Sequence, residues 1–362
     1  MNEDQISLQR MASQKLTTPS FTTPEEVVSW MGAMQAQDFN MAKLAVGIRM
    51  QDGDETKVAK ALDKGEIIRT HVLRPTWHFV SAKDIYWMNA RSLVRIKKAM
   101  AYNDKLLGLT DKVFSKALKV VEKALENGAH LTRDVLADAL EKNKIITSEN
   151  RLAHILMRAE LEGIACSGAM HGKQQTYALL SKRVPAVKSL PRDEAITKLT
   201  NIYFQSRGPA TLADFAWWSG LSPKEAVQGL EDVKHKLSLI NIKGKDYWMT
   251  TSDKPIAKNV KRSIMLIPAF DEFIISYKDR SASLLDEHTA KAITKNGIFH
   301  PVILLNGKAV GIWKRITEKD KIILSPHFFA KPDASTFKLF KQSSLSLERF
   351  SGKKIEINYE AT

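Results

Sequence analysis

Residues 206–225 read Ser-Arg-Gly-Pro-Ala-Thr-Leu-Ala-Asp-Phe-Ala-Trp-Trp-Ser-Gly-Leu-Ser-Pro-Lys-Glu, and they decide the fold of the chain. Positions 209–218 predict a short helix, and 219–221 predict the turn that ends it. Ser222 and Glu225 form a capping box around Pro223, because the hydroxyl and the carboxylate satisfy backbone amides that a first helical turn leaves unpaired. A second helix is therefore expected to begin at this point.

The segment after this box completes a winged helix, which is a helix-turn-helix followed by a β-wing. We expect strands at 237–242 and 246–250, joined by a hairpin tip that carries Lys243 and Lys245. Helix, turn, helix and hairpin in this order are typical of DNA-binding modules. The buried stripe of the second helix is expected to consist of Ala226, Val227 and Leu230. Core positions are expected for Trp217, Trp218 and Trp248.

The middle of the chain has a similar pattern. Residues 131–141 are expected to be helical, and Ser148 is expected to cap a further helix that ends at Gly163. Strands at 164–167 and 176–180 then flank a polar loop. This order predicts a second winged-helix unit.

The N-terminal part of the chain has the same elements. Thr23, Pro24 and Glu26 form a capping box, and 57–64 predicts a helix that Gly65 ends. Residues 66–80 are expected to be extended, with a break at Pro75. One apolar helix face is expected to contain Val27, Trp30, Met31 and Met34.

The pattern changes near residue 264 to short β-strands separated by turns such as Asn306-Gly307. The chain is therefore predicted to be α+β, with three tandem winged-helix units and a C-terminal β-barrel-like element. The simpler alternative to winged-helix units is an α+β protein with several hairpins. The expected C-terminal strands are 264–268, 273–277, 301–305, 309–314 and 321–324. The expected boundaries are 1–105, 106–190, 191–258 and 259–362.

Composition points to an anionic partner. The 362 residues carry a net charge of +15, which creates a positive field that attracts phosphates. No apolar run reaches the length of a membrane span, the acidic start does not resemble a signal peptide, and a single cysteine excludes an internal disulfide. We expect a cytoplasmic protein without metal or cofactor. One basic cluster contains Arg91, Arg95, Lys97, Lys98 and Lys105, and a second contains Lys243, Lys245, Lys254, Lys258, Lys261 and Arg262.

Two short segments have the composition of a site. Gln35-Ala36-Gln37 directly follows an apolar helix face, and its two carboxamides can share one side only if the helix has ended by about Met34. A solvated helix end is the plainer interpretation of this pair. The second segment combines arginine, histidine, threonine and tryptophan on a predicted strand, which suits phosphate contacts and base stacking but also suits a strand with a buried apolar face. Its candidate DNA-binding residues are Arg69, His71, Arg74, Thr76 and His78.

These segments, in this order, resemble the AlkZ/YcaQ-like winged-helix DNA glycosylases over most of the chain. The resemblance implies a concave DNA-binding body and a Gln-x-Gln catalytic signature, which Gln35 and Gln37 match. Pro75 departs from the glycine found in many relatives. The similar segments are 34–39, 69–78, 206–221, 268–280 and 297–313.

The resemblance further implies a monofunctional DNA glycosylase, an N-glycosyl hydrolase that releases N7-alkylated guanine and unhooks interstrand crosslinks. Its partner would be double-stranded DNA, bound by a monomer that associates with the nucleoid. A carboxamide is a poor general base, but it can orient water and aim a carbonyl dipole at an oxocarbenium-like sugar. We therefore expect Gln37 to hold the water and Gln35 to orient it, while Asp38 bonds locally. The alternatives are a non-catalytic winged-helix regulator and a nucleic-acid chaperone.

Overall fold

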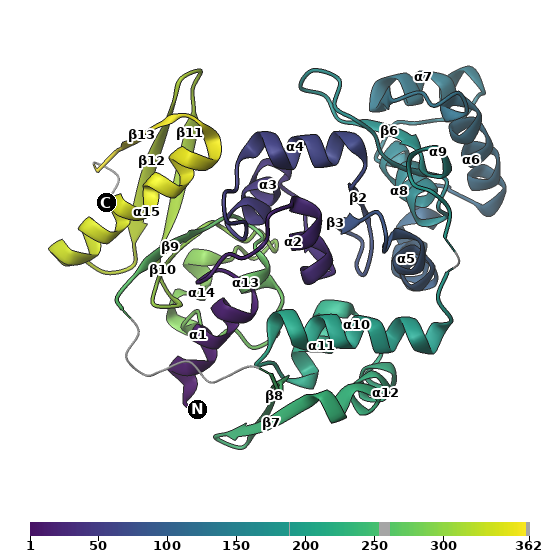
Figure 1. Cartoon of the computed structure of the whole chain (residues 1–362). Coiled ribbons are helices and arrows are strands. Elements are labelled where there is room, and N and C mark those ends of the chain that lie inside the picture. The colour runs from purple at the N-terminus through teal and green to yellow at the C-terminus, as the bar shows by residue number, and fades with distance from the viewer. Residues whose placement is uncertain (188, 253–260, 360–362) are drawn as a thin grey trace. The chain divides into compact units, whose positions relative to one another are not determined.

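The computed structural model describes residues 1–187, 189–252 and 261–359, and it has a mixed α+β fold (Figure 1). The chain forms two compact units, which are described separately below. Unit 1 consists of Met1–Val58 and Ile196–Thr362, and unit 2 consists of Ala59–Ala195. The boundaries between them fall within helices α4 (Glu55–Lys64) and α10 (Arg192–Arg207).

The N-terminal part of unit 1 alternates short helices with one short strand. Thr23 caps α2 and exchanges hydrogen bonds with Glu26, as the predicted capping box requires. Helix α2 ends at Met31, so Met34 lies on the following strand and not on the helix. The elements are α1 (Glu3–Ser13), α2 (Pro24–Met31), β1 (Ala33–Gln35) and α3 (Phe39–Gly47).

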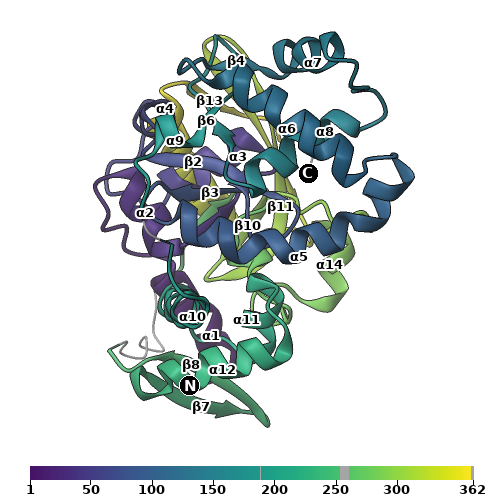
Figure 2. The same cartoon turned by 90° about the vertical axis from the view of Figure 1, so that its right-hand side faces the viewer.

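Residues 212–250 fold as a helix pair and a hairpin (Figure 2). Gly220, in the left-handed conformation, ends the first helix, and the box of Ser222 and Glu225 begins the second. The hairpin turns at Lys243 and Gly244, both with positive φ. The elements are α11 (Leu212–Ser219), α12 (Pro223–Val233), the 3-10 helix η1 (Lys234–Lys236), β7 (Leu237–Ile242) and β8 (Lys245–Thr250).

Two side chains of this segment depart from the prediction. Val227, expected in the buried stripe of α12, is 47% exposed, whereas Ala226 and Leu230 are buried. Trp217 is also exposed, and its indole donates a hydrogen bond to the Ile275 carbonyl. Helical spacing placed Val227 too deep, and the apolar character of Trp217 did the same for that residue.

The rest of unit 1 is a five-stranded sheet with helices (Figure 1). Its order is β13-β12-β11-β10-β9, antiparallel except for the parallel β12–β13 pair, and α15 contacts β9 and β13. Asn306 and Gly307 form the two-residue turn between β10 and β11, as predicted. The elements are β9 (Ile264–Ile267), α13 (Glu272–Ile275), α14 (Asp286–Ala292), β10 (Val302–Leu305), β11 (Lys308–Thr317), β12 (Lys321–Phe328), α15 (Ala334–Ser351) and β13 (Lys354–Ile357).

The predicted strand at 273–277 is wrong, because these residues include most of the one-turn helix α13. The Asp271 carboxylate caps this helix by accepting a hydrogen bond from the Phe273 amide at 2.8 Å. A short apolar run fits a buried strand and a buried helical turn equally well, and the cap decides between them.

Unit 2 contains two groups of strands and a helical core. Strands β2 and β3 pair antiparallel, and a further sheet has the order β4-β6-β5. Asn150, in the left-handed conformation, precedes α8, so Ser148 is not the cap that we predicted. The elements are β2 (Ile67–His71), β3 (Trp77–Ser81), α5 (Ile85–Leu106), α6 (Asp111–Leu125), β4 (Leu131–Thr132), α7 (Arg133–Lys142), α8 (Arg151–Leu161), β5 (Ala165–Ser167), β6 (Thr176–Leu179) and α9 (Leu180–Arg183).

The helical core of unit 2 consists of apolar side chains from α6, α7 and α8, among them Phe114, Val121, Leu136, Leu140 and Ile155. Across the described parts of both units, every helix is too short or too polar to cross a lipid bilayer.

Candidate functional site

The glutamine pair lies on an extended segment of unit 1 between two helices. Helix α2 ends before Gly32, whose φ of 70° turns the chain into β1, and α3 begins at Phe39. The requirement that the helix end before Gln35 is therefore met. Gln35 is 7% exposed, whereas Gln37 is exposed to solvent. Within the described residues, the Gln37 side chain makes no hydrogen bond.

The strand that carries Gln35 is held by a buried acid. The Glu272 carboxylate on α13 accepts a hydrogen bond from the Gln35 backbone amide at 2.8 Å. The same carboxylate accepts from Arg207 Nη2 at 2.8 Å and from the Trp218 indole at 2.9 Å. The Arg207 guanidinium also donates to the carbonyls of Met31 and Ala33, at 2.8 and 2.9 Å. Backbone groups on both sides of Gly32 thus bond to one ion pair.

Helix α3, which follows the glutamine pair, is held in a similar way by Asp271, the acid next to Glu272 in the sequence. Asp271 and Arg49 form a two-point ion pair, with both Nη···Oδ distances 2.8 Å and both side chains 0% exposed. Arg49 also donates to the Ala45 carbonyl of α3 and to the Gln14 side chain, both at 2.7 Å. Two consecutive acids therefore anchor the elements on either side of Gln37.

Asp38 has a local role, as predicted. Its carboxylate caps α3 by accepting hydrogen bonds from the amides of Asn40 and Met41, at 3.1 and 3.0 Å. A cation lies within electrostatic range of Asp38: burial lowers the pKa of Arg315 on β11, and the charges of Asp38 and Glu55 partly oppose this shift. Gln37 is thus followed by an acid whose carboxylate is used in capping α3, and Arg315 interacts electrostatically with that acid.

Arg69 and His71 on β2 bond within unit 2. The Arg69 guanidinium lies 3.9 Å from the centre of the Trp77 ring and donates to the side chain of Gln175. The His71 ring bonds to the Glu160 carboxylate, which also accepts from the His71 backbone amide at 3.1 Å. Both side chains are at most 7% exposed, and their DNA-binding role stays a prediction.

The turn between β2 and β3 is the more accessible part of this segment. Arg74 and Thr76 are partly exposed, and Pro75 is exposed. His78 is 0% exposed, with its Nδ1 2.9 Å from the Thr76 carbonyl oxygen. The Thr76 hydroxyl is itself buried, so Arg74 is the residue of the five that a ligand could reach most readily from the surface of unit 2.

Three members of the second basic cluster, which lies in unit 1, form ion pairs with acids. Lys243 pairs with Glu3 at 2.8 Å and Lys245 with Asp279 at 2.6 Å, and the hydrogen bond from Lys245 raises its pKa. Arg262 pairs with Asp333. Lys254 and Lys258 lie outside the described residues.

The basic cluster of unit 2 is more open and lies on α5. Lys98 and Lys105 are exposed, while Lys97 pairs with Glu162 at 3.1 Å. Asp104, the one acid in this stretch of sequence, is buried against His154 and Arg158, so it does not neutralise the exposed lysines. Among the described residues, Lys98 and Lys105 of α5 form no ion pair, whereas Lys243 and Lys245 at the hairpin tip both do.

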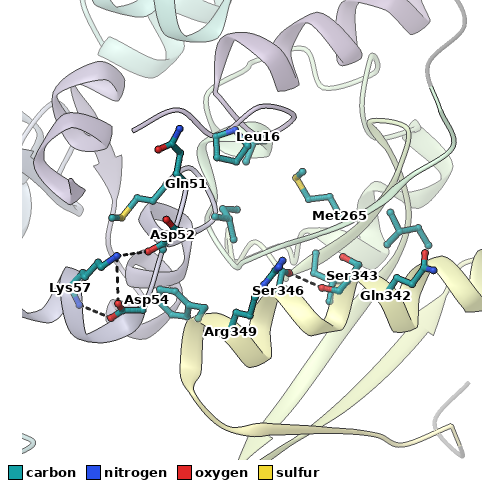
Figure 3. A pocket seen from close by; sticks show the side chains of 18 residues that line it. Leu16, Gln51, Asp52, Asp54, Lys57, Met265, Gln342, Ser343, Ser346 and Arg349 are labelled. Atoms are coloured by element: carbon teal, nitrogen blue, oxygen red, sulfur yellow. Dashed lines mark hydrogen bonds and ion pairs between the residues drawn. The ribbon is translucent and has the colours of Figure 1, made fainter. Parts of the chain in front are cut away.

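A separate pocket of about 550 Å³ lies in unit 1, and it contains none of the predicted site residues. Figure 3 shows Gln342, Ser343, Ser346 and Arg349 of α15 lining it, with Lys57 among the other labelled side chains. The Lys57 ammonium donates to the Asp52 carbonyl at 2.9 Å. Acids and bases are mixed around this pocket, and no grouping of three metal-ligating side chains is present in the described chain.

Sequence reasoning missed the buried pairs of Glu272 with Arg207 and of Asp271 with Arg49. Both arginines and both acids lie in stretches whose local pattern suggests only helix or turn. Their partners are more than 60 residues away in the chain, so helical or strand periodicity carries no sign of the pairing. The only signal was an Asp-Glu pair within an otherwise apolar run at 267–277.

Comparisons with known proteins agree with this architecture. Residues 28–342 match the family model described as DNA glycosylase AlkZ-like. A curated relative, an interstrand DNA cross-link repair glycosylase from Streptomyces sahachiroi, is 23% identical over 364 residues, which cover 96% of each chain. The solved structure of the Streptomyces sahachiroi DNA glycosylase AlkZ aligns with a TM-score of 0.77 at 22% identity, covering 99% of this chain and 100% of that one.

Proposed function

The chain belongs to the AlkZ-like DNA glycosylase family, and from this premise we propose that it is a monofunctional glycosylase that hydrolyses the N-glycosidic bond of N7-alkylated guanine in duplex DNA. The observation that carries the proposal is the exposed carboxamide of Gln37, on an extended segment anchored on both sides by buried ion pairs. A neutral amide that is free to bind water suits a reaction whose leaving group is already activated.

The chemistry depends on the positive charge of N7-alkylguanine. Cleavage of the glycosidic bond relieves that charge and leaves an oxocarbenium-like sugar, to which water adds. Gln37 binds the attacking water through its carbonyl oxygen, and the water proton passes to solvent after attack, since an amide does not accept it. The carbonyl dipole also stabilises the positive sugar. Uncharged bases are therefore much poorer substrates.

Gln35 acts from the protein side of the same segment. It is 7% exposed, so it has little room for substrate but can orient a neighbouring group. We assign it the role of fixing the water and supporting the sugar. The carboxylate of Asp38 is occupied with the first amides of α3 and is not needed as a base.

The proposal also covers the winged-helix units, the DNA contacts and the crosslinked substrate, which we infer from membership of the same family. The helix pair and hairpin at 212–250 supports the view that the chain carries tandem winged-helix units. Arg74 supplies contacts to phosphate or lesion, and the more buried polar groups of Arg69, His71, Thr76 and His78 support that turn from within the unit. Crosslinked guanine is included in the substrate class because the curated Streptomyces relative is named for crosslink repair.

The decisive experiment measures release of 7-methylguanine from a duplex under single-turnover conditions. We expect Gln37→Ala to slow release by about 10²–10³-fold, as expected for loss of one preorganised polar group at a reacting centre. Asp38→Asn is the matched control, since asparagine also caps a helix, and it should stay within a few-fold of wild type. Wild-type rates from Gln37→Ala would remove the assignment. DNA binding without base release by the wild-type protein would favour the non-catalytic regulator.

A further inference from the structure

We infer that Glu272 and Arg207 are positioning residues for the glutamine pair, acting on it through the backbone of β1; this inference rests on the proposed function. Neither side chain can touch DNA or water in bulk, because Arg207 is 0% and Glu272 1% exposed. Their effect on base release must therefore pass through the groups that they bond. Those groups are the backbone amide of Gln35 and the carbonyls of Met31 and Ala33.

The geometry fixes the segment from Met31 to Gln35 at three points, one at the end of α2 and two on β1. One carboxylate oxygen of Glu272 accepts from the Gln35 amide, and the other accepts from Arg207 and Trp218. Arg207 in turn donates hydrogen bonds to the carbonyls of Met31 and Ala33. A guanidinium is a rigid planar fork, so these bonds together define both the position and the twist of the strand.

The packing around the ion pair holds its members in place. The Arg207 guanidinium carbon lies 4.2 Å from the centre of the Trp218 ring, and Trp218 is itself fully buried. The Ser276 hydroxyl, also buried, donates to Glu272 and accepts from Arg207 Nε at 2.9 Å. A pair with this many partners keeps one geometry, which is what a reaction that depends on water placement requires.

The contacts also favour this interpretation over direct catalysis by Glu272. Each carboxylate oxygen already accepts a hydrogen bond from a buried donor, and the acid faces an arginine at 2.8 Å. It therefore has no accessible oxygen with which to take a proton from water. Its charge instead holds the donors that define the strand.

Glu272→Gln tests the inference while keeping the shape of the side chain. Glutamine can still accept from the Gln35 amide, but its own amino group then faces the donors of Arg207 and Trp218. We expect single-turnover release of 7-methylguanine to fall by about 10–100-fold, the range for a misplacement of the order of 1 Å. Affinity for undamaged duplex should stay within about twofold, because no DNA contact is removed. Amide exchange of the peptide covering 32–38 should rise.

Tyr203→Phe is the matched control. The Tyr203 hydroxyl is fully buried in the same cluster and donates to the Ser276 carbonyl at 3.0 Å, so its hydrogen bond goes to the end of α13 and not to residues 31–35. The Tyr203→Phe variant should be less stable than wild type, but its rate of base release and the amide exchange of residues 32–38 should stay near the wild-type values. In a Gln35→Ala/Gln37→Ala background, Glu272→Gln should slow release no further, because a residue that acts through the glutamine pair has nothing left to position.

Three results would overturn the inference: a Glu272→Gln rate within twofold of wild type, an equal slowing by Tyr203→Phe, or a further slowing by Glu272→Gln when both glutamines are already alanine. If Glu272→Gln does not fold, Trp218→Phe removes one donor from the carboxylate and keeps the ion pair, and it should show the same pattern at smaller size. A wild-type protein that releases no base contradicts the proposed function instead, and hydrogen exchange of 32–38 then decides the positioning by itself.

Discussion

The Arg49–Asp271 pair offers the sharpest test of how burial changes the strength of an ion pair in this protein. Its two Nη···Oδ distances are 2.8 Å and neither side chain is exposed. The exposed Lys243–Glu3 pair has the same 2.8 Å distance, with side chains 74% and 51% exposed. Distance alone predicts equal contributions to stability, whereas desolvation predicts very different ones.

Asp271→Asn isolates the charge. Asparagine caps a helix as well as aspartate does, so the bond to the Phe273 amide can remain. Arg49 cannot become neutral by losing a proton, because a guanidinium stays charged in proteins. The variant therefore leaves a buried, uncompensated cation, which costs about 3–5 kcal/mol. Glu3→Gln at the exposed pair should cost less than about 1 kcal/mol.

Differential scanning calorimetry compares the two variants. For a cooperative unit of about 150–250 residues, each kcal/mol lowers the Tm by about 2–4 °C. We expect the transition of unit 1 to fall by about 6 °C or more in Asp271→Asn and by about 4 °C or less in Glu3→Gln. Equal shifts in the two variants, or a shift below about 2 °C in Asp271→Asn, would refute the reasoning.

Two further predictions concern alkaline stability and DNA affinity. Burial raises the pKa of the Cys166 thiol and of the Tyr277 hydroxyl to about 12 each, so between about pH 9 and 12 the unfolded chain binds fewer protons and stability falls as pH rises. Urea midpoints at pH 8 and 10.5 should show this fall, and Cys166→Ala should make it shallower; a midpoint that does not change with pH would contradict it. Lys98→Gln should weaken DNA binding and reduce the slope of log K against log salt concentration by about 0.9, whereas Lys243→Gln should do so less, because Lys243 pairs with Glu3. Fluorescence anisotropy at several salt concentrations measures both slopes, and a larger effect of Lys243→Gln would show that the wing dominates.

Local signals in the sequence were sufficient for the elements whose ends are defined by their own residues. The capping box of Ser222 and Glu225 and the turn at Asn306-Gly307 are both present, because each is decided within four residues. The strand predicted at 273–277 failed for the opposite reason. Its helical turn depends on Asp271, whose orientation is fixed by Arg49, more than 200 residues away.

In the candidate site, too, the features set by local sequence could be predicted and those set by tertiary contacts could not. The extended path of Gln35 follows from the helix end at Gly32, which a glycine after an apolar face favours. The burial of Arg69 and His71 could not be predicted, since Gln175 lies in the loop before β6 and Glu160 lies on α8, both far along the chain. Composition identified residues capable of binding phosphate, and tertiary contacts decided which of them remained accessible.

The proposed reaction explains why such costly pairs surround the glutamines. A buried ion pair stabilises a fold no better than well-packed apolar side chains do, so Glu272–Arg207 and Asp271–Arg49 contribute little net stability. What they provide is a fixed backbone geometry, because several directional bonds converge on β1 and α3. A carboxylate base can tolerate some error in position, since its charge acts over distance. A neutral amide acts through one short hydrogen bond to water, so its effect depends on where the backbone places it. The position of Gln37 between two anchored elements is therefore what the proposed chemistry requires.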